Sequence, residues 1–189
     1  FKNIMVNKDR PVEIESPTTG LGPTRNVMSR RAMGIITVII VAGDQLTKHL
    51  VRSQLMLHDA IEVIPGFLNL VHVRNTGAAF GFLNVVDLPF KRALMTSIAL
   101  IALGAIGFYT WRVEAQETLS RTGLSLILGG AVGNLIDRAF MGYVVDFIDV
   151  YMNSVHFWAF NVADSAITVG ACLLIIDMFL ATDDVSTSL

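Results

Sequence analysis

The sequence predicts an α-helical integral membrane protein with four transmembrane helices and a small β-sheet between the first two helices. Of its 189 residues, 53% are hydrophobic and only 16% are charged, and the mean hydropathy is +0.59. A typical soluble domain is about 25% charged. The apolar residues lie in four blocks, each near the ~20 residues that cross ~30 Å of hydrocarbon as a helix. The first two blocks are separated by a stretch with a strand pattern.

The four apolar blocks set the expected helices. Residues 93–111 carry no charge, and residues 122–136 are uncharged up to Asp137. The last block contains one charge before its end, and the first has polar residues only near its end. The segment after the first block lacks a small-x-small cleavage site, so we expect this helix to remain in the mature protein rather than to be removed as a signal peptide. Helices are therefore predicted at about 32–51, 93–111, 122–140 and 158–178.

The remaining segments complete the predicted organisation. Residues 1–30 are polar, contain several prolines and show no periodicity, so we expect a disordered N-terminal segment. Residues 31–180 form a single membrane-embedded domain, and residues 181–189 form a C-terminal tail. Within residues 58–84, two β-branched apolar runs flank the turn dipeptide Pro65-Gly66, which predicts a small sheet on one face of the membrane.

Charge and cysteine content exclude several classes of protein. The 14 Lys+Arg and 16 Asp+Glu residues give a net charge of −2, so no nucleic-acid partner is expected. A single cysteine, Cys172, excludes an intramolecular disulfide and a multi-thiolate metal site. The four histidines are dispersed without an HExxH motif, and there is no phosphate-binding glycine loop. We therefore expect neither metal nor cofactor.

The orientation of the chain is indicated by the arginines before the first helix. Arg30 and Arg31 favour a cytoplasmic N-terminus, because basic residues are enriched on the cytoplasmic side. Four spans then place the C-terminus on the same side.

Polar residues at membrane depth form the functional signal, because such residues are costly in hydrocarbon. Three pairs at helical spacing fall near helix ends that alternating topology places at one membrane face. The predicted strands and Asp146 lie at the same face. The pairs are Asp44 with Lys48, Asn134 with Arg138, and Asn161 with Asp164.

Each pair also has a purely structural interpretation. Asp44 and Lys48 can neutralise each other, Arg138 can extend to the headgroups or pair with Asp137, and Asn134 can join helices beside the GxxxG spacing of residues 129–133. Asp164 differs, because it has no basic residue three or four positions away. Its carboxylate needs a partner from another helix, or it must stay protonated.

Two carboxylates can catalyse hydrolysis without a covalent intermediate when they share one proton. Asp164 is one candidate. Asp146, Asp149 and Asp137 are candidates for the second, and spacing alone leaves the choice among them open. A proton-coupled carrier or a lipid-binding assembly factor could use the same cluster, so these two non-enzymatic classes also stay open.

Five motifs occur in an order that resembles the bacterial lipoprotein signal peptidases, also called signal peptidase II or prolipoprotein signal peptidases. The resemblance covers roughly residues 31–178. The motifs are Asp44-Gln45-Leu46-Thr47-Lys48, Asn75-Thr76-Gly77-Ala78-Ala79-Phe80, Gly130 to Arg138, Val145-Asp146-Phe147 and Phe160 to Ala166.

This resemblance implies an aspartic endopeptidase that removes signal peptides from prolipoproteins carrying diacylglycerol on a cysteine, by cutting before that cysteine. It implies that Asp146 and Asp164 are the catalytic dyad. It further implies that Asp44 and Lys48 are structural. The residues that support the dyad or hold substrate are, by the same resemblance, Asn75, Gly77, Asn134, Arg138 and Asn161.

The resemblance also implies a location and partners. The enzyme would lie in the bacterial inner membrane, with both termini cytoplasmic and the active site near the periplasmic leaflet, where the sheet forms a cradle. Its partners would be prolipoprotein substrates, membrane lipids and globomycin-type cyclic peptide inhibitors. A monomer is expected.

Overall fold

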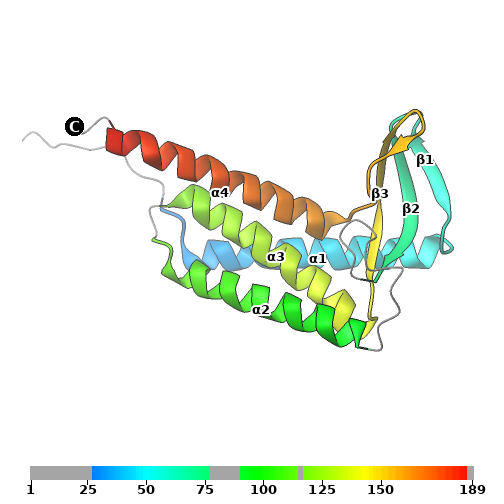
Figure 1. Cartoon of the computed structure of the whole chain (residues 1–189), viewed down its shortest axis with the longest axis horizontal. Coiled ribbons are helices and arrows are strands. Elements are labelled where there is room, and N and C mark those ends of the chain that lie inside the picture. The colour runs from blue at the N-terminus through cyan, green and yellow to red at the C-terminus, as the bar shows by residue number, and fades with distance from the viewer. Residues whose placement is uncertain (1–26, 77–89, 115–116, 187–189) are drawn as a thin grey trace, which may run out of the picture.

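Four long helices lie side by side, and a small sheet crosses one end of the bundle (Figure 1). The computed structural model describes residues 27–76, 90–114 and 117–186. The helices are α1 (Arg30–Gln54), α2 (Lys91–Arg112), α3 (Thr118–Phe140) and α4 (Val162–Ser186). Each is long and apolar enough to span a membrane. The predicted fold class, a four-helix membrane protein with a small sheet, is confirmed.

The ends of α4 differ from the predicted range of 158–178. The helix begins only at Val162, because the preceding Phe160 pairs with Ile148 of a strand. Asn161 then caps the helix by accepting a hydrogen bond from the backbone N–H of Asp164 at 2.9 Å. At its other end α4 runs to Ser186, so a helix continues into the expected tail.

The central helix of the bundle is α3, which packs against α1, α2 and α4, whereas α2 packs only against α3 in the described part of the chain. Glycines allow these close approaches. A Cβ atom on Gly130 would lie 2.3 Å from the backbone oxygen of Ala163 in α4. Gly129 and Gly133, the predicted GxxxG pair, instead face Ile40 and Asp44 of α1.

We expect Gly130→Ala to lower the stability of the protein by about 1–3 kcal/mol, because the added methyl group forces α3 and α4 apart at a backbone contact. The thermal unfolding temperature in detergent measures this effect. Gly104→Ala is the matched control, since a Cβ on Gly104 meets nothing within 4 Å. Equal unfolding temperatures for the two variants would contradict the expected packing role.

The sheet is four-stranded and antiparallel, in the order β1-β2-β3-β4, with β1 at Ala60–Ile64 and β2 at Leu68–Asn75. β3 (Val144–Met152) and β4 (Val155–His156) come from the connection between α3 and α4. The prediction of a sheet formed only between the first two helices was therefore incomplete. Residues 144–152 are rich in β-branched and aromatic side chains, which favours a strand.

An apolar cluster joins the sheet to the bundle. Val51 and Leu55, at the end of α1, pack with Val145 and Phe147 of β3. Because side chains alternate along a strand, Asp146 projects to the opposite face from these two neighbours. Its side chain is nevertheless buried, with only 2% of the residue exposed. The cluster therefore fixes β3 against the end of α1, with Asp146 on the other face of the strand.

Candidate active site

The chain between Asp146 and Asp164 folds back on itself as a hairpin. β3 runs outward from Asp146, turns after Met152 and returns through β4. At the base of the hairpin, Ile148 and Phe160 exchange backbone hydrogen bonds of 2.8 and 3.0 Å. The start of α4 is thereby returned to the side of Asp146, and Asp164 lies in its first turn.

Asn161 connects the two aspartates. Its Nδ2 atom donates a hydrogen bond of 2.7 Å to Oδ1 of Asp146. Its Oδ1 atom accepts from the backbone N–H of Asp164 at 2.9 Å. Asn161 is fully buried. One rigid side chain therefore fixes the β3 aspartate relative to the helix that carries the other.

Two further asparagines donate to the carboxylates. Asn134 of α3 donates to Oδ1 of Asp164 at 2.8 Å, which provides the interhelical partner that the sequence predicted for this residue. Asn75, at the end of β2, donates to Oδ2 of Asp146 at 3.0 Å. The donor from Asn75 stabilises the ionised form of Asp146.

A buried charge cluster lies behind Asn134. Lys48 contacts Asp44 at 2.8 Å and Asp137 at 2.9 Å, and all three side chains are completely buried. Lys48 also donates to Oδ1 of Asn134 at 2.9 Å. Because this oxygen faces the ammonium group, the amide nitrogen of Asn134 is turned toward Asp164.

Two members of this cluster are not among the residues to which the resemblance assigned a role, although Asp137 was a candidate for the second carboxylate. Asp137 pairs with Lys48 and accepts from the backbone N–H of Val145 at 3.3 Å. Gln45 donates to Asp137 at 3.1 Å. Asp137 lies three residues after Asn134 on α3, and this spacing was the available signal that both face the same way.

The other predicted residues lie as follows. Arg138 is at the same end of α3, where its Nη1 atom donates to the backbone oxygen of Asn134 at 3.4 Å. Asp149 lies on the sheet, where Asn69 and His156 contact it at 3.0 and 2.9 Å. Gly77 lies outside the described residues. Of the three candidates for the second carboxylate, the structure brings Asp146 to Asp164.

The surroundings of Asp146 favour its protonated form. Burial, followed by the negative charge of Asp164, raises the pKa of Asp146 from the usual 3.8 to about 6. The hydrogen bonds from Asn75 and Asn161 and the charge of Lys48 act in the opposite direction. A carboxyl group with a raised pKa beside a second carboxyl group allows the pair to hold a single proton, as acid–base catalysis of hydrolysis requires.

Comparisons with known proteins agree with this architecture. The sequence model of the signal peptidase (SPase) II family matches residues 36–180. The chain is 48% identical over 146 residues to a lipoprotein signal peptidase of Maridesulfovibrio salexigens, which covers 77% of this chain and 94% of that protein. It is 44% identical over 149 residues to a lipoprotein signal peptidase of Syntrophus aciditrophicus, and this match covers 76% of this chain and 92% of that protein.

A solved structure described as a bacterial membrane enzyme, determined by the in meso method at 2.3 Å resolution, has a TM-score of 0.74 and 34% identity. The match covers 85% of this chain and 94% of that one. Fold and comparisons together define a multi-pass membrane peptidase of the aspartic class. The chain belongs to the lipoprotein signal peptidase family, signal peptidase II. This membership favours the peptidase over the carrier and the assembly factor.

Proposed function

We propose that the protein removes signal peptides from diacylglyceryl-modified prolipoproteins by cutting before the lipidated cysteine, with Asp146 and Asp164 as the catalytic dyad. The main support is the pair of carboxylates that Asn161 ties together where the sheet meets the bundle. The names of the relatives support the substrate class.

In the proposed reaction, ionised Asp164 takes a proton from a water molecule while protonated Asp146 donates a hydrogen bond to the scissile carbonyl oxygen. The water oxygen attacks the carbonyl carbon and forms a tetrahedral intermediate. A proton then passes from the dyad to the cysteine nitrogen and the C–N bond breaks. The signal peptide leaves with a new carboxyl terminus, and the lipidated cysteine gains a free amine.

The position of the dyad suits a lipidated substrate. The acyl chains of such a substrate lie in one leaflet, so its scissile bond lies near the membrane surface. The dyad lies at the ends of the spanning helices, where β3, which carries Asp146, meets the start of α4, which carries Asp164. We assign the sheet to the periplasmic side of the inner membrane and both termini to the cytoplasm. Asn75, Gly77 and Arg138 are assigned to substrate contact, and globomycin-type peptides to the same site.

A gel-shift assay with purified protein and a diacylated prolipoprotein tests this function. We expect conversion to a shorter, lipidated product, and no conversion of the same precursor without its diacylglycerol. Equal cleavage of both precursors would contradict the proposed substrate class. Absence of cleavage under conditions where a relative's enzyme is active would contradict the proposed activity.

The raised pKa of Asp146 predicts a pH dependence. For the free enzyme, kcat/KM should fall as pH rises through about 6, because Asp146 loses its proton and both carboxylates are then ionised. Asn75→Ala removes a hydrogen bond that stabilises ionised Asp146, so the pKa rises and the alkaline decline moves to higher pH. A pH series of initial rates measures the shift.

Asn69→Ala is the matched control for this prediction, since Asn69 lies on the same strand but donates to Asp149. Its alkaline decline should coincide with that of the unchanged enzyme. If the alkaline decline of kcat/KM in Asn75→Ala stays at the same pH or moves to lower pH, Asp146 is not the titrating acid.

A further inference from the structure

A cavity lies at the end of the bundle opposite to the sheet. Here α1 and α2 do not pack closely against each other, although Arg30 of α1 reaches the backbone of Trp111 in α2, and α3 closes the space between them. The resulting cavity has a volume of about 440 Å³, within the ~300–1,000 Å³ typical of ligand pockets. Gly34 of α1 and Gly107 of α2 line it. A Cβ atom built on either glycine would meet nothing within 4 Å, so both leave open space.

The wall of this cavity is apolar in character despite its hydroxyl groups. Thr37 donates to the backbone oxygen of Ser125 at 3.1 Å, and Ser125 donates to that of Arg121 at 2.6 Å. Thr110 donates to the backbone oxygen of Ile106 at 2.7 Å. Because these hydroxyl protons are donated to backbone oxygens within and between the helices, the wall mainly presents carbon, which suits a hydrocarbon chain.

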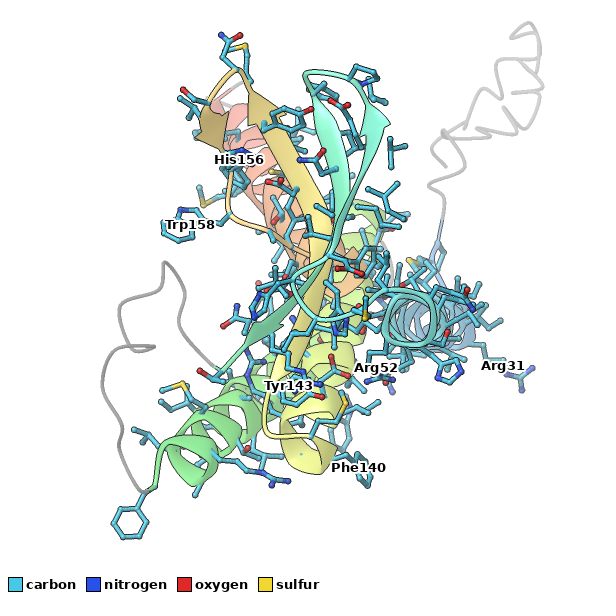
Figure 2. All side chains as sticks on the ribbon, turned by 90° about the vertical axis from the view of Figure 1, so that its right-hand side faces the viewer. Arg31, Arg52, Phe140, Tyr143, His156 and Trp158 are labelled. Carbon is cyan, nitrogen blue, oxygen red and sulfur yellow. The ribbon has the colours of Figure 1, made fainter. Side chains whose placement is uncertain are left out.

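The mouth of the cavity is cationic. Arg30 lines it and donates to the backbone oxygen of Trp111 at 3.5 Å. In the described part of the chain, no carboxylate forms a salt bridge with Arg30. Trp111 is 73% exposed beside it, and tryptophan is enriched where membrane meets water. Arg112 ends the same helix. Arg31, in contrast, points away from the bundle (Figure 2).

We propose that this cavity binds an anionic phospholipid, with one acyl chain between Gly34 and Gly107 and the phosphate of the headgroup on Arg30. Charge complementarity favours this occupant over a signal peptide, because the basic end of a signal peptide would meet the arginines. The bound lipid fills the gap between α1 and α2.

Native mass spectrometry of the purified full chain in detergent tests the site, with phosphatidylglycerol and phosphatidylcholine of identical acyl chains as probes. We expect the unchanged protein to retain phosphatidylglycerol preferentially. Gly107→Leu fills the cavity and should weaken phosphatidylglycerol binding at least about tenfold, or about 1.4 kcal/mol. Arg30→Gln should reduce the preference for the anionic headgroup about fivefold, the effect expected from one basic residue near a lipid surface.

Two matched variants serve as controls. Gly104→Leu adds the same side chain to α2 at an open position that does not line the cavity, and Arg31→Gln removes a neighbouring charge that points away. Both should bind phosphatidylglycerol as the unchanged protein does. Equal binding by Gly107→Leu and Gly104→Leu would overturn the cavity as a site. Equal retention of both lipids by the unchanged protein would overturn its selectivity for anionic lipid. All four variants should keep peptidase activity, so the result is independent of the proposed cleavage reaction.

Discussion

Asp146→Asn and Asp164→Asn should each lower the rate of cleavage of a diacylated prolipoprotein by about 10²- to 10⁴-fold or more, while substrate binding persists. In the proposed reaction each change removes a group that gives or receives a proton in the transition state, and such groups contribute rate factors of this size. Asparagine preserves the shape of the side chain, so the loss of activity reflects the loss of proton transfer rather than a change in packing. Gel-shift rates with both purified variants measure it, together with the retention of labelled precursor.

Asp149→Asn is the control for this pair, because Asp149 lies on the same strand but contacts Asn69 and His156. It should retain activity. Full cleavage by either dyad variant would exclude that residue from catalysis.

Asp146→Asn should also be stable. The pKa of Asp146 is raised from 3.8 to about 6, so the folded protein holds this proton more tightly than the unfolded chain. Ionising Asp146 in the folded state therefore lowers stability as pH rises from about 4 to above 6, by about 3 kcal/mol in total at pH 7. Asp146→Asn removes this cost, so its unfolding temperature at pH 7 should equal or exceed that of the unchanged protein.

Lys48→Met is expected to produce the largest loss of stability in the protein, about 3–5 kcal/mol. The substitution leaves the carboxylates of Asp44 and Asp137 buried without their cation, and an uncompensated buried charge carries a cost of this size. Asn134 also loses the donor that turns its amide group toward Asp164. Cleavage by any folded fraction should therefore decrease. Thermal unfolding in detergent and the yield of membrane-inserted protein measure the stability effect.

Arg52→Met is the matched control for Lys48→Met. Arg52 lies one turn further along α1, is half-buried, and donates to the sulfur of Met141 rather than to a carboxylate. Its loss should change the unfolding temperature little. Comparable destabilisation by the two variants would argue against the buried charge cluster as the source of the effect.

The helices could be predicted from the sequence because a membrane span requires a long segment with few charges. The polar pairs could be predicted because residues three or four positions apart lie on the same face of a helix. The contribution of β3 to the sheet could not be predicted from the sequence, because Asp146 and Asp149 interrupt the apolar pattern of this strand. Their odd separation places them on opposite faces of the strand, and only the strand assignment reveals this.

The pairing of Asp137 was also hidden in the sequence. Its neighbour Arg138 suggested a local pair, whereas the cation that neutralises it is Lys48 on another helix. Asn161 is informative in a different way. Its spacing from Asp164 indicated a shared helix face, but the residue caps the helix and reaches back to β3. Contacts of this kind depend on tertiary structure, which spacing along one element does not encode.

The hairpin between the two aspartates has a consequence for how this family can evolve. The backbone pairs at Ile148 and Phe160 close the hairpin at its base, next to the dyad. Its far end, at Asn153, is a turn with a positive φ of 55° on the outer edge of the sheet. Residues inserted or lost at that tip lengthen or shorten an arm beyond the closure without altering the spacing of the carboxylates. Changes in the length of the arm can therefore alter what it touches while the two carboxylates keep their separation.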